Sequence, residues 1–483
     1  MLRRRRSFGL LAVLLAACAA PAPAPKPAPR TVVLSTAEVD AEVGEEASQA
    51  VAAQVGTVRD KALQAWVQAL GRKLVKFAPP QPFAYQFQVI DQWSPNAFAL
   101  PGGHIFVSRG LLVLTNSEDE LACVLAHEIT HAAARHAAGR QAYAEQLNPF
   151  SLGIPRMATV AAYERDQERA ADTGGQRICS AAGYDPRALG VFLQSLDKIE
   201  RLQMGASRIP TFLDTHPSSP ERVAGASILA ATLRAPGGRD PRESRAAYLA
   251  HLDGLILGTD PAEGVIEGQH FLHPDLDFSV GFPAGWKIAN TPAAVVAISP
   301  KGDARFALEL AGVGDDPEAV AQTYLRKRLA EVRAKIDFAE PQKTLCCKTY
   351  VVRGQVATPQ GVIAGQLTWV ALGGKVYRLS AATVPSKADK YADRARQMVR
   401  SLRPLTAEER ASIRVDRLRL ARAKAGETLA EFSARTHNVY DAHRTAIAND
   451  VEVGARLAAG QLLKIGLRGP YAAAVDGASL GGL

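Results

Sequence analysis

Apolar and polar residues follow two different patterns along the chain, and the pattern changes near residue 260. From about residue 36 to 258, apolar residues recur mostly at helical spacing, as they do in 57–77. Two short stretches interrupt this pattern, Phe87–Ile90 and Ile105–Val107, where β-branched and aromatic residues between turn signals predict strands. Residues 36–258 therefore predict a mainly helical domain that contains a small β-sheet.

Beyond a hinge at about 258–268 the pattern becomes mostly strand-like. Helical stretches near 317–335 and 387–402 accompany the strands, so we expect a small α+β domain over 266–405. His270 and His273 of this domain fall in a predicted loop, where we expect surface histidines. The six predicted strands are 278–282, 295–298, 306–310, 350–356, 362–372 and 376–383.

Residues 412–467 form a third predicted unit, and a loose Gly/Ala-rich tail follows at 468–483. The order of a strand, a Gly-x-Thr-Leu turn, two helices and a closing strand resembles a LysM module. Glu427 stands where such modules carry Asp, and Asn449 falls in the position of their Asn. The resemblance implies the module's fold and suggests a peptidoglycan partner, for which the departure at 427 predicts weak or no binding. The matching stretches are Arg417–Ala423, Gly426–Leu429 and Gly460–Ile465.

The first eighteen residues indicate an export signal, with basic Arg3–Arg6, apolar Phe8–Leu15 and small residues before Cys18. The apolar stretch is shorter than the roughly 20 residues that a spanning helix needs. Leu15-Ala16-Ala17-Cys18 resembles the lipobox of bacterial lipoproteins, which implies a signal peptide at 1–18 and lipidation of Cys18 on the periplasmic face of the outer membrane. A plain secretory signal is the alternative. Residues 19–35 are rich in Ala and Pro and predict an extended tether.

Charge and cysteine content narrow the class of protein. The formal net charge is +9, and removal of Arg3–Arg6 would leave about +5, a surplus too small to indicate a nucleic-acid partner. Besides Cys18 the chain has four cysteines, too few for a disulfide framework in 483 residues. Cys123 and Cys179 lie in apolar helical patterns and are expected as small core residues, with a bridge between them left open.

The sharpest chemical motif is His127-Glu128-Ile129-Thr130-His131. Ser117 and Glu120 predict a capping box that begins this helix, on which His127 and His131 share one face and can bind one Zn²⁺. Glu128 then lies beside the metal, where it can take a proton from water and pass it to a departing amine. A purely structural zinc site is disfavoured, because such sites have four protein ligands rich in Cys.

A second helix further along the chain carries acids at four-residue spacing. Glu164, Glu168 and Asp172 share one face of it, where unpaired they would repel one another. We expect Glu168 to be the third metal ligand and Asp172 to orient a ligand imidazole. The alternative is a solvated acidic face that Arg165 and Arg169 balance.

H-E-x-x-H followed by a helical E-x-x-x-D is similar to the BepA/HtpX family of gluzincin metallopeptidases, relatives of the CAAX prenyl proteases. Asn96–Val107 and Thr215–Arg222 match further motifs of that family, and the resemblance covers about 36–255. It implies a zincin protease domain with one Zn²⁺ per chain and polypeptide substrates among envelope or outer-membrane proteins. The chain departs from these relatives after the protease, where they often carry a helical-repeat domain.

His216 and Arg222 are the remaining candidate site residues. The resemblance implies that His216 can bind the metal as a fourth ligand and keep the enzyme latent. Alternatively His216 or Arg222 donates a hydrogen bond to the oxyanion, or His216 only caps a helix that begins near Ser219. We expect a substrate peptide to pair with an edge strand at Ile105–Val107.

Two functions from different classes follow from these patterns. The first is a zinc endopeptidase that degrades or processes misassembled cell-envelope proteins. The second is a peptidoglycan-associated, chaperone-like binding lipoprotein, suggested by the LysM-like segment.

Overall fold

The structure is a computed structural model that describes residues 36–136, 165–203, 212, 216, 220–234, 241–291, 294–329, 334–343, 347–358 and 361–471. The predicted signal peptide, the lipidated Cys18, the Ala/Pro tether, Glu164 and most of the predicted tail lie outside the described residues. Among the described residues, no helix is both long enough and apolar enough to cross a bilayer.

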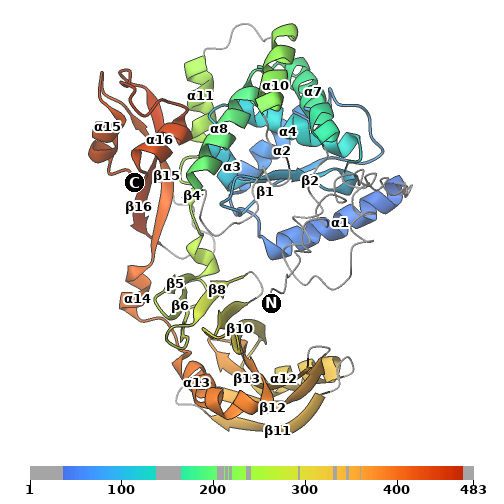
Figure 1. Cartoon of the computed structure of the whole chain (residues 1–483), viewed down its shortest axis with the longest axis vertical. Helices are drawn as coiled ribbons and strands as arrows, with labels where there is room; N and C mark the ends of the chain where they lie inside the picture. Colours follow the sequence, from blue (N-terminus) through green and yellow to red (C-terminus); the bar gives the residue numbers. More distant parts are fainter. Residues whose placement is uncertain are drawn as a thin grey trace, which may run out of the picture.

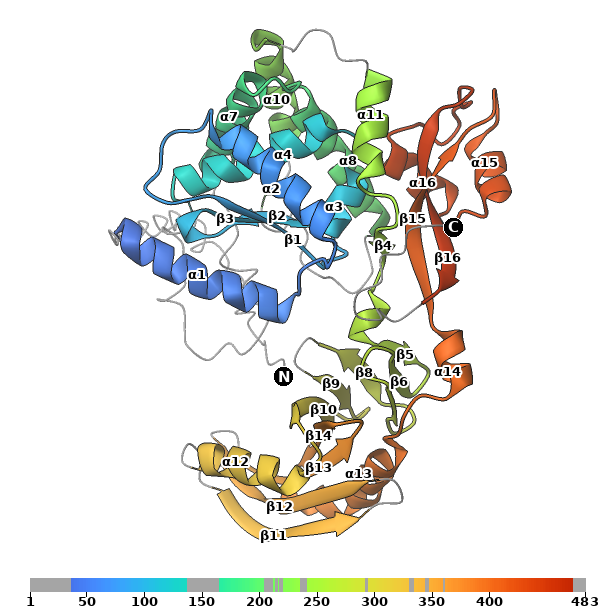
Figure 2. The same cartoon turned by 180° about the vertical axis from the view of Figure 1, so that it is seen from behind.

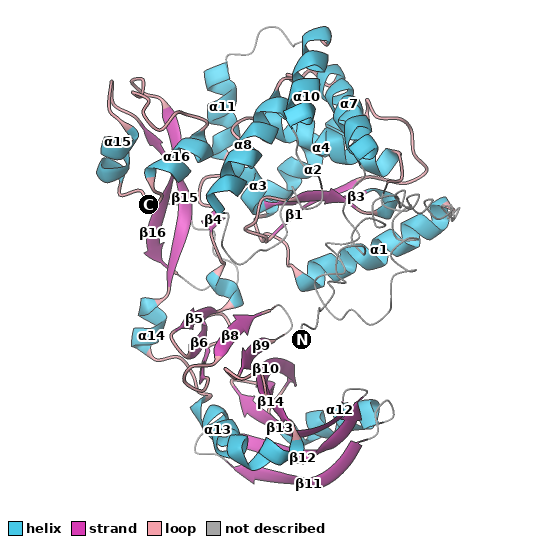
Figure 3. Ribbon diagram, viewed as in Figure 1, coloured by secondary structure: helices cyan, strands magenta, loops and turns pink. Residues whose placement is uncertain are grey.

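Helices and strands are both abundant, which confirms a mixed α+β structure. In Figure 1 a helical part lies at the top, a small unit formed by the C-terminal residues lies beside it, and a sheet-rich part lies below. Figure 2 shows the same arrangement from behind, and Figure 3 shows that most strands belong to the lower part.

The helical part surrounds a three-stranded sheet. Strand β1 (Gln86–Ile90) pairs in parallel with β3 (His104–Ser108), and β2 (Ala97–Ala99) pairs antiparallel with the other side of β3. The described helices are α1 (Ala37–Gln54), α2 (Lys61–Val75), α3 (Arg109–Leu114), α4 (Glu118–Ala133), α7 (Arg165–Ala181), α8 (Ala188–Gln203), α10 (Pro220–Thr232) and α11 (Pro241–Ala250).

The sheet confirms both predicted strands but corrects the predicted edge. Residues 105–107 belong to β3, which is the central strand of this sheet and has a partner on either side. The expectation that Ile105–Val107 form an edge strand is therefore wrong, and β2 is the antiparallel edge. Pairing between distant strands decides their order, and the local sequence pattern does not contain that information.

Helix α4 is almost entirely buried, and its start is close to the prediction. The hydroxyl of Ser117 accepts a hydrogen bond from the backbone N–H of Glu120. The carboxylate of Glu120 accepts one in return from the backbone N–H of Asn116, one residue before the position that a capping box would use. A disulfide joins Cys123 of α4 to Cys179 of α7, which answers the question that the sequence left open.

The lower part contains a seven-stranded antiparallel sheet in the order β11-β12-β13-β14-β10-β9-β8. Trp369 packs with Tyr324 of α12, while the next residue, Val370, packs in a cluster with Tyr391 of α13, so the two helices cover opposite faces. The elements are β5 (Val265–Glu267), β6 (His270–His273), β7 (Phe278–Gly281), β8 (Lys287–Asn290), β9 (Val295–Ile298), β10 (Ala304–Val313), α12 (Pro317–Leu329), β11 (Ala334–Lys343), β12 (Lys348–Thr358), β13 (Gly361–Leu372), β14 (Lys375–Thr383) and α13 (Ala388–Ser401).

Two expectations for this part are wrong. The predicted helix at 317–335 ends at Leu329, and β11 begins at Ala334, because pairing with β12 outweighs the weak helical pattern there. His270 and His273 lie in β6 and not in a loop, and burial lowers the pKa of His273 to about 4.

The C-terminal part consists of β15 (Arg414–Arg422), α15 (Leu429–Thr436), α16 (Ala442–Asn449) and β16 (Leu462–Pro470), preceded by α14 (Ala407–Ser412). Strands β15 and β16 pair antiparallel, and β4 (Ile256–Leu257) adds a third strand to this sheet. We call residues 414–470 the C-terminal module. Its order of elements is the one predicted, β16 extends into the predicted tail, and its assignment as a LysM module stays a prediction.

The Cys123–Cys179 bridge generates a stability prediction. Replacing both cysteines with alanine should lower the free energy of unfolding by about 2–4 kcal/mol, because the bridge closes a loop of 56 residues. Urea unfolding of the oxidised protein and the double variant measures the difference. Wild-type protein unfolded in the presence of reductant should resemble the variant, and equal stability of all three samples would contradict the prediction.

Candidate metal centre

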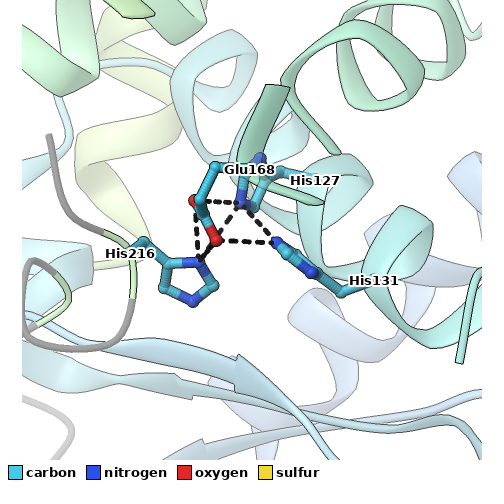
Figure 4. A group of neighbouring side chains, drawn as sticks. All are labelled: His127, His131, Glu168 and His216. Carbon is cyan, nitrogen blue, oxygen red and sulfur yellow. Dashed lines mark hydrogen bonds and ion pairs between the residues drawn. The ribbon is translucent and has the colours of Figure 1, made fainter. Parts of the chain in front are cut away.

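Four side chains from three places in the chain converge at one point (Figure 4). His127 and His131 lie one turn apart on α4, Glu168 lies in the first turn of α7, and His216 precedes α10. Each of the four offers one ligand atom, and these atoms all lie within 4.8 Å of one another. The structure thus brings together the three predicted metal ligands and the predicted fourth.

The spacing between these atoms fits a tetrahedral metal ion. Nε2 of His127 is 3.0 Å from Nε2 of His131 and 3.4 Å from Nδ1 of His216. The carboxylate of Glu168 is 3.0 Å from Nδ1 of His216 and 3.4 Å from Nε2 of His131. Ligands about 2.0–2.1 Å from a tetrahedral ion are about 3.3 Å from each other, which is close to these distances. Imidazole nitrogen with one carboxylate oxygen is also a donor set that suits Zn²⁺.

Burial and charge also favour a cation at this point. Glu128, Glu168 and Asp172 are all buried, and when ionised they carry three negative charges. Arg222 supplies one buried positive charge beside them. Among the described residues of the centre, two negative charges are left over if the histidines are neutral, and a divalent ion balances them. The burial of Glu168 and Asp172 is also inconsistent with a solvated acidic face.

The carboxylate of Asp172 lies beside His127, where it can orient this imidazole; its role in holding a metal ligand stays a prediction. Its carboxylate is 3.1 Å from Nδ1 of His127, so that an N–H at Nδ1 leaves the lone pair of Nε2 for the metal. Burial opposes the charge of Asp172, but hydrogen bonds from Arg222 and His127 outweigh burial and hold its pKa below the ordinary value. Burial lowers the pKa of His127, which favours the neutral imidazole that a metal requires.

Arg222 connects the two acids of α7. Its Nε and Nη2 donate to the carboxylate of Asp172 at 2.8 and 2.7 Å, and its Nη1 is 2.9 Å from Glu168. Nη1 also donates to the backbone carbonyl of His216 at 3.3 Å. Arg222 therefore fixes Glu168, Asp172 and His216 relative to one another, which makes it a positioning residue in this structure. Its predicted role as an oxyanion donor stays a prediction.

Glu128 lies next to the cluster without belonging to it. Its side chain is fully buried, and its Oε1 is 3.5 Å from Nε2 of His216. The predicted proton acceptor is thus adjacent to the candidate metal position. Its catalytic role is a prediction that geometry alone does not test.

The structure adds two residues that the sequence reasoning missed. Nδ1 of His136 is 2.9 Å from Nδ1 of His131, on the side away from the cluster, where a second imidazole can orient the ligand. Arg135 at the end of α4 has a φ of 53°, and this turn brings His136 back toward His131. Phe212 stacks on His216 with ring centroids 4.3 Å apart. A histidine five residues after the motif was a visible signal for His136, whereas nothing in the sequence marked Phe212.

Comparison with known proteins bears on the same region. The model of "Peptidase family M48" matches residues 61–156 and 150–229. The mitochondrial metalloendopeptidase OMA1 of Schizosaccharomyces pombe is 32% identical over 175 residues, which cover 33% of this chain and 50% of that protein. The beta-barrel assembly-enhancing protease of Escherichia coli is 27% identical over 201 residues, which cover 37% of this chain and 41% of that protein. The chain thus spans half or less of the length of these relatives.

A solved structure was matched as well. Cyanobacterial PsbP from Synechocystis covers 31% of this chain at 14% identity with a TM-score of 0.25. A likeness of this size supports no functional argument.

Close packing of α4 against α7 generates the second prediction. A Cβ atom added at Gly175 would lie 2.8 Å from the Cα and the N of His127, so Gly175→Ala must push the two helices apart. We expect it to lower stability by about 1–3 kcal/mol and to weaken zinc binding, because Glu168 and Asp172 move away from His127. Thermal unfolding and zinc competition with a chromophoric chelator measure the two effects.

Gly225→Ala provides a matched control for this variant. Gly225 is also inside a helix, α10, but an added Cβ there meets nothing within 4 Å. Its stability should be unchanged or slightly higher. If Gly175→Ala bound zinc as tightly as Gly225→Ala, the helix contact would not govern the metal centre.

Proposed function

We propose that this chain is a zinc-dependent endopeptidase, because residues 61–156 and 150–229 match the model of peptidase family M48. The observation that carries the proposal is the buried cluster of His127, His131, Glu168 and His216 with mutual distances that suit one tetrahedral ion. In the active state His127, His131 and Glu168 hold one Zn²⁺, and Asp172 and Arg222 keep them in place. Zinc supplies Lewis acidity toward a water molecule and the scissile carbonyl.

Glu128 moves the proton in this proposal. Its carboxylate takes a proton from the attacking water and then passes it to the nitrogen of the departing amine. Its position suits this role, because the buried carboxylate lies beside the four candidate ligands, with Oε1 3.5 Å from Nε2 of His216.

The substrate binds as an added strand. The peptide pairs with β2, whose residues Ala97–Ala99 have β3 as their partner on one side. Backbone hydrogen bonds along β2 then hold an extended segment with little dependence on side chains, which suits a protease that acts on unfolded polypeptides.

The proposed substrates are misassembled or extended proteins of the cell envelope. The support is the name of one group of relatives, beta-barrel assembly-enhancing proteases, together with the predicted signal peptide. We accordingly place the protein at the periplasmic face of the outer membrane, anchored through Cys18. The rival function, a chaperone-like lipoprotein bound to peptidoglycan, depends on the LysM-like assignment of residues 412–467 alone.

The arrangement of His216 supports a latent resting state. His216 is fully buried, with Nδ1 3.0 Å from Glu168 and 3.4 Å from Nε2 of His127, so it occupies the position of a fourth ligand. Phe212 stacks on its ring and Arg222 binds its carbonyl. In this resting state His216 occupies a position that the substrate carbonyl or the attacking water would take in the active state.

Glu128→Gln tests the chemistry. We expect cleavage of casein or an unfolded porin to fall by about 10²–10⁴-fold, because the amide cannot accept the proton. Zinc content, measured by metal analysis, should stay at one per chain, since Glu128 is not among the proposed ligands. Equal cleavage by wild type and variant would remove Glu128 from the mechanism, and the absence of zinc in the wild type would refute the metal centre.

His216→Ala tests latency. If His216 blocks the centre, the variant should raise basal proteolysis by about tenfold for every 1.4 kcal/mol by which the closed state is favoured. If His216 instead donates to the oxyanion, turnover should fall by about 10²-fold or more. Initial rates on a quenched-fluorescent casein substrate distinguish the two roles. An unchanged rate would leave His216 with only the helix-capping role.

A further inference from the structure

A lysine of the C-terminal module is buried inside the helical part of the protein. The side chain of Lys464 on β16 has no exposed surface. Its Nζ donates hydrogen bonds to the backbone carbonyls of Val113 at 2.7 Å and Thr115 at 2.8 Å. These carbonyls lie at the C-terminal end of α3, where a helix leaves such groups without partners of its own.

The segment that Lys464 holds leads directly into the metal-binding helix. Only Asn116 and the capping residue Ser117 separate Thr115 from α4. Arg245 of α11 holds the same segment from another side, since it donates to the backbone carbonyl of Asn116 at 3.1 Å and to its side chain at 2.8 Å. We call residues 113–117 the α3–α4 junction.

The position of Lys464 is itself fixed within the module. Asn449, the last residue of α16, accepts a hydrogen bond from the backbone N–H of Lys464 at 2.7 Å and donates one to its carbonyl at 2.9 Å. Asn449 is the residue that the sequence analysis placed in the Asn position of a LysM module. In this chain it aims Lys464 at the α3–α4 junction.

The module also shares a hydrophobic core with the helical part. Leu418 and Tyr440 of the module are buried in the same cluster as Leu112 and Leu125. Strand β4, which directly follows the helical part, pairs with β15 of the module. The module is therefore packed as part of the M48 domain, and a shift of β16 has to move residues next to α4.

We infer that Lys464 is a positioning residue for the metal-binding helix, and that the C-terminal module acts through it as a structural support of the metal centre. The inference rests on the proposed function in that α4 carries the metal ligands. Helix α4 is a rigid, buried rod, and His127 lies about 14 Å along it from its start at Glu118. Metal ligands tolerate displacements of about 0.5 Å, so a small tilt or slide at the α3–α4 junction is enough to disturb them.

The two bonds of Lys464 do not depend on its charge. Burial lowers the pKa of its ammonium group, but the neutral amine still has two N–H donors for the two carbonyls. Removal of the amine leaves both buried carbonyls without this donor, a loss that the junction relieves by shifting.

Lys464→Met in the full chain is the direct test, because methionine keeps most of the apolar stem and removes the donor. We expect zinc affinity, measured by chelator competition, to fall by about tenfold or more. Hydrogen exchange of the amides in residues 113–121 should become faster, and kcat should fall more than KM rises.

Phe432→Leu is the matched control. Phe432 is fully buried in the module's own core on α15, among residues such as Leu429 and Leu463, and is not part of the junction. It should lower the stability of the module while leaving zinc affinity and exchange of residues 113–121 as in the wild type. If the two variants changed these quantities equally, or if Lys464→Met changed neither, the inference would be overturned.

Two further outcomes keep the test decisive. If Lys464→Met does not fold, Asn449→Ala replaces it, because it removes the two bonds between the Asn449 side chain and the backbone of Lys464 but leaves the amine in place. This variant also removes the longer contact of Asn449 with Arg245, at 3.4 Å. Asn449→Ala should lower zinc affinity and speed up exchange of residues 113–121, both by a smaller factor than Lys464→Met. No change in either quantity would count against the inference. If the wild type binds no zinc, the proposed function fails. The inference is then decided by hydrogen exchange alone: amides in residues 113–121 should exchange faster in Lys464→Met than in Phe432→Leu.

Discussion

The contact between α4 and α7 is the constraint on which the metal centre depends. Two of the candidate ligands come from α4 and one from α7, so their distances are set by how closely two helix backbones approach. That approach requires residues without side chains, since a Cβ at Gly174 would meet Thr130 and one at Gly175 would meet the backbone of His127. The Cys123–Cys179 bridge joins the same two helices about one turn before His127. Close packing and a covalent link thus hold the ligands before any metal binds.

Repulsion between the carboxylates of the centre opposes the close packing of α4 and α7. Three buried carboxylates surround one guanidinium, and without a cation the remaining repulsion falls on the α4–α7 contact. A bound divalent ion would remove this repulsion and add bonds that both helices share. Metal binding and the stability of the helix pair would therefore be coupled, and the ion would contribute to folding as well as to the proposed chemistry. Arg222 relieves part of the repulsion permanently, which explains why its bonds go to the two acids of α7.

The sequence predicted those parts of the site that follow from helical spacing. His127 with His131 and Glu168 with Asp172 each lie four residues apart, and this spacing alone puts each pair on one helix face. The strands near 87–90 and 105–107 were predicted from composition, but their order was not, since β3 is central only because β1 and β2 pair with its two sides. His136 escaped prediction because a left-handed residue after α4 places it, and β11 because its partner β12 decides its conformation. For the strand order and for β11 the missing information was the pairing of strands, whereas for His136 it was the left-handed conformation of Arg135.

The contact of Lys464 with Val113 and Thr115 also joins residues that local patterns do not relate. A lysine in a closing strand predicts a solvated side chain, yet this one reaches the carbonyl of a residue 351 positions earlier in the chain. Between them the chain leaves the helical part through β4, forms the whole seven-stranded sheet, and returns as β15 to pair with β4. The carbonyls of the α3–α4 junction therefore gain this donor only when β16 is in place. A contact between residues so far apart in the sequence carries a large loop-closure entropy, so we expect it to form after the more local contacts of α3 and α4.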